Sequence, residues 1–243
     1  MIKQKQIERA FEEWWSPSLG RDMEMLTFGH SGKPVLGLIG NKERYYDWEN
    51  QEIVGELQWP LAEGFNQLYC IDSIDSECIL NEKVDTDVRI RRYKQYMAYI
   101  SEEVFPFISD QSGYNRITLT GFDTGALHAL NLALHHPEKF EKLVLVNGVY
   151  DIRPFMDGFV DEQIERYNPV TFITNPVNSN RVNKLKELDI RIVASHTETE
   201  YYQAGKLSEG LKQKNVSHQL DFWVEEHQNK WQLWGQMLNK HIP

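Results

Sequence analysis

The segment that most constrains the fold is residues 117–140, which read ITLTGFDTGALHALNLALHHPEKF. It begins with β-branched and apolar residues, continues through a tight turn from Gly121 to Gly125, and ends in an apolar helical pattern that stops before Pro137. This order predicts a strand, a sharp turn and a helix, with Asp123 at the apex of the turn. Glycine is needed on both sides of a strained apex because bulk there would collide with the adjoining strand and helix.

Short apolar runs alternate with helical stretches along the rest of the chain. This rhythm is typical of an α/β fold with a mostly parallel sheet and helices on both faces. A chain of 243 residues without repeats or linkers is predicted to form one domain, residues 1–243. The predicted strands are 25–28, 35–39, 68–71, 117–120, 143–146, 190–194 and 218–223, and the predicted helices are roughly 50–64, 89–107, 124–136, 203–214 and 230–240.

Three connections refine this architecture. The turn at 31–34, SGKP, predicts an antiparallel N-terminal hairpin between the first two predicted strands. The segment 73–87 is a long polar loop, and such loops inside compact domains are often functional. About forty residues separate Val146 from Ile190, which suits an ordinary crossover with one insertion. No large cap domain is therefore expected.

Charge and hydropathy exclude several classes of partner. The formal net charge is −10 and the largest basic cluster is RIRRYK at 89–94, so the chain should repel nucleic acid. The N-terminus, MIKQKQIERAFEEWW, has acidic residues where a secretory signal would be apolar. No apolar run is long enough to span a membrane. We expect a cytoplasmic protein that does not associate with membranes.

Cysteines, metal ligands and tryptophans add three expectations. Cys70 and Cys78 are too few for a disulfide framework and are expected to be free thiols. No cluster of His, Cys, Asp and Glu has metal-ligand spacing, so neither a metal nor a cofactor is expected. Trp14 and Trp15 fit either a core or a dimer interface, which leaves a homodimer open.

The motifs resemble one esterase family across nearly the whole chain. Gly121 to Gly125, His128, HHP at 135–137, Phe140 and GVYD at 148–151 resemble the elbow, helix and next strand of the esterase family that includes esterase D. The stretch WWSPSLGRDMEMLTFGHSGKPVL resembles its N-terminal hairpin, and LDFWVEEHQNKWQLWGQML resembles its C-terminal segment. The resemblance implies an α/β-hydrolase fold.

Two of the three catalytic positions implied by the resemblance are substituted. Such esterases use a serine nucleophile, a histidine base and an acid that orients the histidine. Asp123 stands at the serine position, and Asn229 falls at the histidine position when the C-terminal segments are compared without gaps. His227 lies two residues earlier and could serve as an alternative base in a rearranged loop. The acid position falls to Glu198 or Glu200, and their spacing does not decide between them.

The oxyanion hole of this fold is made of main-chain N–H groups. The resemblance places one donor at Thr124 and the other in the turn Gly40-Asn41. Restoring Asp123→Ser and Asn229→His together is expected to restore ester hydrolysis if these donors and an acid are still in place. Among the histidines of the predicted helix, His128 is expected to be satisfied and half-buried, and His135 and His136 to be exposed.

Three interpretations of Asp123 remain open. The carboxylate could cap the following helix. It could be a nucleophile, as in haloalkane dehalogenases and epoxide hydrolases, which this chain resembles in having Gly-x-Asp-x-Gly, with His227 as the base. It could also bind a neutral or cationic small molecule in the ancestral esterase pocket. Because both the nucleophile and the base are substituted, we favour a catalytically degenerate protein with a binding or regulatory role over an active hydrolase. A third possible class is a structural subunit that pairs with an active relative.

Overall fold

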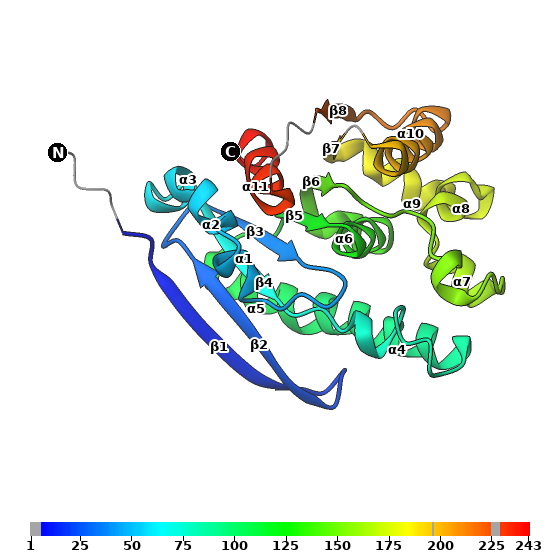
Figure 1. The fold of residues 1–243 in the computed structure, drawn as a ribbon, viewed down its shortest axis with the longest axis horizontal. Helices are drawn as coiled ribbons and strands as arrows, with labels where there is room; N and C mark the ends of the chain where they lie inside the picture. Colours follow the sequence, from blue (N-terminus) through cyan, green and yellow to red (C-terminus); the bar gives the residue numbers. More distant parts are fainter. Residues whose placement is uncertain (1–5, 196, 225–228) are drawn as a thin grey trace.

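One eight-stranded sheet organises the chain, and the computed structural model describes residues 6–195, 197–224 and 229–243 (Figure 1). Every strand pair is parallel except the two at one edge, where β1 pairs with β2 and β2 with β4. The mostly parallel α/β sheet predicted from the sequence is thereby confirmed. In spatial order the strands are β1 (Arg9–Ser16), β2 (Arg21–Phe28), β4 (Asn66–Ile71), β3 (Lys33–Leu38), β5 (Ile117–Phe122), β6 (Phe140–Val146), β7 (Asp189–Ser195) and β8 (Gln219–Trp223).

The antiparallel N-terminal hairpin is present, but other residues form it than the sequence predicts. β1 and β2 form the hairpin, with Ser16 opposite Arg21 beside the connecting turn. The turn at 31–34 leads instead from β2 to β3, which are not neighbours because β4 lies between them. The sequence prediction omits β1 because all but one of its side chains are exposed or partly exposed. Charged side chains are common on such edge strands, where they discourage further pairing.

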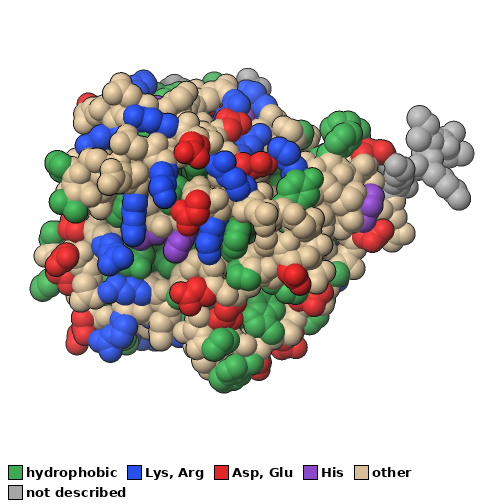
Figure 2. Space-filling view, turned by 180° about the vertical axis from the view of Figure 1, so that it is seen from behind, with side chains coloured by type: hydrophobic (Ala, Val, Ile, Leu, Met, Phe, Trp, Pro, Cys, Tyr) green, Lys and Arg blue, Asp and Glu red, His purple; other side chains and the backbone are tan. Residues whose placement is uncertain are grey.

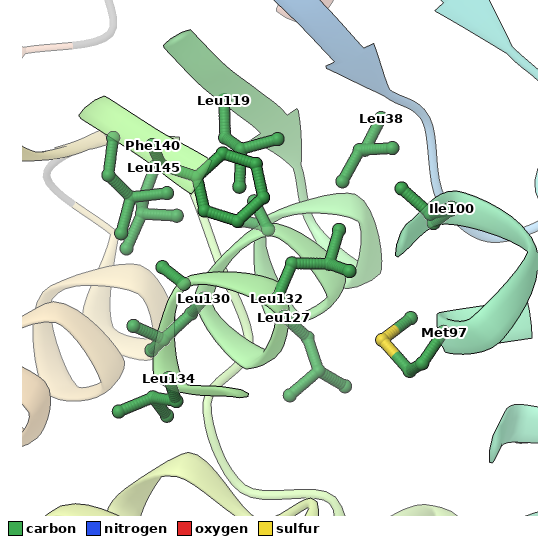
Figure 3. Packing of buried hydrophobic residues seen from close by; sticks show 14 of the residues in the cluster. Leu38, Met97, Ile100, Leu119, Leu127, Leu130, Leu132, Leu134, Phe140 and Leu145 are labelled. Carbon is green, nitrogen blue, oxygen red and sulfur yellow. The ribbon is translucent and has the colours of Figure 1, made fainter. Parts of the chain in front are cut away.

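Helices cover both faces of the sheet (Figure 1). Successive strand residues point to opposite faces, so Leu36 joins the core under one helical layer and Val35 the core under the other. Figure 3 shows Leu127 and Leu130 among the buried side chains of the first of these cores. This core lies under α4 (Thr86–Tyr99), α5 (Phe105–Ser112), α6 (Thr124–His135), α7 (Glu162–Arg166), α8 (Pro169–Thr174), α9 (Ser179–Lys184) and α10 (Glu198–Gln213). The opposite core lies under α1 (Asp47–Asn50), α2 (Ile53–Glu56), α3 (Gln58–Ala62) and α11 (Lys230–His241).

Three predicted helices differ from those observed. The helix predicted at 50–64 is divided into α1, α2 and α3, because Glu52 adopts a left-handed conformation with φ 63° between the first two. The helix predicted at 89–107 is longer: α4 continues through a π-helical turn at Ile100–Val104 into α5. The helix predicted at 203–214 begins earlier, at Glu198. Short 3₁₀ turns lie at Asp75–Glu77, Pro137–Lys139, Arg153–Met156, Pro176–Asn178 and Leu185–Glu187.

The two N-terminal tryptophans have different environments. Trp14 stacks on Tyr99 and Phe107, with ring centroids 5.8 and 5.9 Å away, and is therefore part of the core. Trp15 is 61% exposed on the edge strand, and the homodimer stays a prediction. Cys70 and Cys78 are buried free thiols, as predicted. Among the helices of the described residues, none combines the length and the apolar character that a membrane span requires.

Candidate functional site

Asp123 occupies the apex of the strand, turn and helix predicted from the sequence. β5 ends at Phe122 and α6 begins at Thr124. The backbone of Asp123 has φ 52° and ψ −119°, a conformation that non-glycine residues rarely adopt. Its side chain makes no capping hydrogen bond to α6, although its carboxylate interacts with the main-chain N–H of the adjacent Thr124. The capping geometry therefore does not support the helix-cap interpretation. Backbone conformations of this kind are found disproportionately at functional sites, which makes Asp123 the first candidate for the site.

The flanking glycines are required by close packing. A Cβ atom at Gly121 would lie 2.3 Å from the carbonyl oxygen of Gly125, and one at Gly125 would lie 2.2 Å from the carbonyl oxygen of Leu38. Both obstacles are backbone atoms, which cannot move aside without shifting a strand or helix. The turn is therefore fixed by its neighbours on both sides.

We predict that Gly125→Ala lowers the free energy of unfolding by about 1–3 kcal/mol, the usual cost of overpacking. The matched control is Gly205→Ala in α10, where an added Cβ meets no atom within 4 Å. That substitution should stabilise the protein by about 0.5–1 kcal/mol, because alanine is the better helix former. Urea denaturation of both variants measures the difference. Equal stability of the two would contradict the packing described at the turn.

The carboxylate of Asp123 is partly buried and has one side-chain hydrogen-bond donor among the described residues. Asn41 Nδ2 donates to Asp123 Oδ2 at 2.5 Å. Burial raises the pKa of Asp123, and the nearby charge of Asp75 raises it further. The bond from Asn41, the charge of Lys230 and the main-chain N–H of Thr124 act in the opposite direction. The net result is a pKa above the usual value for aspartate.

A buried carboxylate, Asp75, lies behind this turn. Its Oδ2 accepts from the main-chain N–H of Asn41 at 2.9 Å and from the Thr124 hydroxyl at 2.5 Å. Its Oδ1 lies 2.8 Å from His128 Nε2. Asp75 and His128 have side chains that are 0% exposed, so His128 is satisfied as predicted but fully rather than half-buried. The Asp75 carboxylate ties the loop after β4 to both the Asn41 turn and α6.

The network continues from His128 into the protein interior. His128 Nδ1 lies 3.2 Å from the Tyr93 hydroxyl, which also accepts a hydrogen bond from Asn131 Nδ2 at 3.0 Å. One hydrogen arrangement satisfies all of these groups: Nε2–H donates to Asp75, Tyr93 O–H donates to Nδ1, and Asn131 donates to Tyr93. Asp75, His128 and Tyr93 thus form a buried chain of hydrogen bonds, and Asn131 Oδ1 at its inner end has no partner among the described residues.

The main-chain donors expected to form the oxyanion hole already have partners. The Asn41 N–H donates to Asp75 and also to Thr124 Oγ1, 2.8 Å away. The Thr124 N–H interacts with the carboxylate of Asp123. Gly40 allows this close approach, because a Cβ there would lie 2.1 Å from Thr124 Oγ1. The Asn41 N–H, one of the two expected oxyanion donors, therefore already has two acceptors in the protein.

The residues at the base position are placed only in part. Asn229 is exposed and caps α11, with its Oδ1 accepting from the Trp231 N–H at 3.1 Å. That it shares a pocket with Asp123 stays a prediction. His227 lies outside the described residues, so its role as an alternative base also stays a prediction. No histidine of the described segments forms a hydrogen bond with Asp123.

Glu198 and Glu200, the candidates for the acid position, lie in the first turn of α10 rather than in a loop. Thr197 caps this helix by accepting from the Glu200 N–H at 3.4 Å. A threonine followed three residues later by a glutamate is a typical start of a helix. The predicted start at residue 203 did not take this pattern, Thr197 and Glu200, into account. Glu198 is exposed and Glu200 is partly buried, so the structure gives neither an evident triad role.

His135 and His136, predicted to be exposed, are both partly buried at the end of α6. Among the described residues, no three His, Cys, Asp or Glu side chains are grouped to hold a metal ion. Asp75 was missed by sequence reasoning, although it lies in the polar segment 73–87 that was singled out as a functional loop.

Comparison with protein families decides the assignment. The model of the "Putative esterase" family matches residues 77–242, which include Asp123 and Asn229. The chain belongs to this esterase family. The match confirms the resemblance inferred from the motifs around residues 117–151 and from the C-terminal segment. Among curated protein sequences, none matches the chain.

Solved esterase structures share the fold over nearly the whole chain. A ferulic acid esterase is 15% identical with a TM-score of 0.76, covering 97% of this chain and 96% of its own. The S-formylglutathione hydrolase FrmB from Staphylococcus aureus is 15% identical, with a TM-score of 0.70 and 98% of both chains covered. An S-formylglutathione hydrolase from Agrobacterium tumefaciens is 13% identical, with a TM-score of 0.75 and 98% and 94% covered. The fold of this esterase-family chain is therefore that of an α/β-hydrolase.

Proposed function

We propose that this esterase-family protein is catalytically degenerate and binds a small molecule at Asp123. The observation that carries the proposal is the hydrogen bond from the Asn41 N–H to the buried carboxylate of Asp75. An ester hydrolase needs such a donor free for the oxyanion of its tetrahedral intermediate. Here an oxyanion would form between two carboxylates, Asp123 and Asp75, and would be repelled by both.

The same groups favour a different ligand chemistry. A partly exposed carboxylate accepts hydrogen bonds and attracts positive charge, so a ligand with N–H or O–H donors suits Asp123. Asn41 already donates to Asp123 Oδ2, which leaves the other carboxylate oxygen for the ligand. We therefore propose a neutral or cationic small molecule as the ligand of Asp123, and expect carboxylates and phosphates not to bind there because of their charge.

Hydrolysis and ligand binding by the same preparation test the proposal. The unmodified protein should hydrolyse p-nitrophenyl acetate at the rate of a control without protein. In thermal shift assays, small amines and polyols should raise the melting temperature more than carboxylic acids of equal size. Asp123→Ala should remove that preference. Rapid ester hydrolysis that depends on Asp123, or an equal response to acids and amines, would refute the proposal.

The alternative, an active hydrolase that uses Asp123 as its nucleophile and His227 as base, has one observation in its favour. Asp123 keeps a strained backbone conformation that would otherwise cost of order 1–3 kcal/mol. An aspartate that attacks a saturated substrate carbon displaces the leaving group and forms an ester intermediate, which water must then cleave at the aspartyl carbon. Single turnover in ¹⁸O-labelled water would place the label in Asp123 if this mechanism operates. Unlabelled Asp123 after product formation excludes it.

The raised pKa of Asp123 gives a prediction with a defined sign. A carboxyl group whose pKa is higher in the folded protein destabilises the fold when ionised, so its penalty is present at neutral pH and disappears as pH falls through the folded-state pKa. We expect Asp123→Asn to raise the melting temperature at pH 7 and to lose this advantage on acidification. Asparagine also tolerates positive φ. The exposed Asp110→Asn is the control, and a pH-independent advantage would contradict the assigned cause.

A further inference from the structure

A second site candidate is a hollow of about 170 Å³ between α4, α6 and the ends of α7 and α9. No residue that lines it holds a catalytic position of the esterase fold described above. Figure 2 shows Lys and Arg side chains gathered around histidine on this face of the molecule. Pockets for drug-sized ligands take about 300–1,000 Å³. The hollow therefore suits a small ion or the end group of a larger ligand.

The hollow has an excess of positive charge in a protein whose net charge is −10. Lys94, Arg166 and Arg181 line it together with a single carboxylate, Glu102. Neither arginine forms an ion pair with a carboxylate of the described residues. In a chain rich in Asp and Glu, two unpaired guanidinium groups beside one hollow leave their charge available to an anion.

The histidine at the base of the hollow is held rigidly among these cations. His135 stacks on Tyr167 with ring centroids 4.8 Å apart, and its Nδ1 donates to the main-chain oxygen of Asn131 at 2.8 Å. Its Nε2 is buried without a hydrogen-bond partner. Burial lowers the pKa of His135 to about 4, and the charges of Arg181 and Arg166 contribute in the same direction. The two guanidinium groups thus act on one ring from different elements.

We propose that this hollow binds a phosphate-like oxyanion, either inorganic phosphate or the phosphate group of a small monoester, through Arg166 and Arg181. The planar guanidinium group presents paired N–H donors that match two oxygens of a phosphate. Anion binding would relieve the repulsion among the lining cations. This site is independent of the proposed function at Asp123, which disfavours anions.

Calorimetric titration of the full chain with inorganic phosphate, with ionic strength kept constant by NaCl, tests the proposal. We expect saturable binding at one site. Arg166→Gln and Arg181→Gln should each weaken binding about tenfold, because each removes a charge-assisted hydrogen-bond donor to the anion. Both arginines are exposed, so neither substitution should unfold the protein. Arg91→Gln, an exposed arginine of α4 paired with Asp87, is the matched control and should change affinity less than twofold.

Two further measurements locate the ligand and identify its class. The imidazole resonances of His135 should shift on phosphate addition, and Asp123→Ala should bind phosphate as the unmodified protein does. Binding of methyl phosphate as well as inorganic phosphate indicates a monoester site, whereas binding of inorganic phosphate alone indicates a site for the free ion. Absence of saturable binding up to about 10 mM, or equal weakening by all three arginine variants, would overturn the proposal.

Discussion

Asp75→Leu is expected to lower the free energy of unfolding by about 3–5 kcal/mol, the usual loss when one member of a buried polar pair is removed. The substitution removes the acceptor of the Thr124 hydroxyl and of His128 Nε2 in the protein interior, and it leaves the Asn41 N–H with Thr124 Oγ1 as its acceptor. Each unsatisfied buried group costs about 1–3 kcal/mol. Urea denaturation monitored by tryptophan fluorescence measures the loss.

A double-mutant cycle separates the pair from its surroundings. His128→Leu alone should also destabilise, because it leaves Asp75 Oδ1 without its partner, and Asp75→Leu/His128→Leu should cost less than the sum of the single variants by about 0.5–3 kcal/mol. The exposed Asp110→Leu in α5 is the control and should stay within about 0.5 kcal/mol of the unmodified protein. Additive single effects would mean that Asp75 and His128 do not act as a pair.

Ester hydrolysis should return only when nucleophile and base are restored together. We expect Asp123→Ser and Asn229→His to be inactive singly, because triad members act as a unit. The double variant should hydrolyse p-nitrophenyl acetate about tenfold or more above either single variant. Its rate should remain low, because one missing oxyanion donor costs about 10²–10³ in kcat and Asp75 holds the Asn41 N–H.

The comparison across four proteins is the test, with initial rates corrected for hydrolysis in buffer. An active unmodified protein would refute the degenerate-esterase proposal. An inactive double variant that is folded would show that two substitutions are not enough, and the buried Asp75 would then be the next group to examine. Because Asn229 caps α11, the stability of each histidine variant must be measured alongside its rate.

The local pattern of residues predicts much of the fold. The strand, the turn at Asp123 and helix α6 follow from glycine spacing and apolar periodicity within one short segment. The edge strand β1 escaped prediction because its sequence, RAFEEWWS, does not alternate apolar and polar residues as a half-buried strand does. The start of α10 at Glu198 could have been predicted from Thr197 and Glu200, because these two residues form a helix-capping pattern.

The environment of Asp123 could not be predicted in this way. Asp75 is 49 residues from Thr124 and 53 from His128 along the chain, and only the folded sheet brings these side chains together. The motif located the turn and its apex, Asp123, but carried no information on which side chain would accept from the neighbouring N–H groups. Long-range polar pairing depends on tertiary packing, for which one sequence has no local signal.

The π-helical turn at Ile100–Val104 has a consequence for aligning this chain with a relative that lacks such a turn. A π turn spans i→i+5 and so accommodates one residue more than an α-helical turn. A relative whose helix is α-helical throughout would have one residue fewer here while both flanking segments face the same way. An ungapped alignment through α4 and α5 would then pair every later residue with a neighbour about 100° around the helix. For a relative of that kind, one gap within residues 100–104 would keep the buried and exposed positions of the two helices in register.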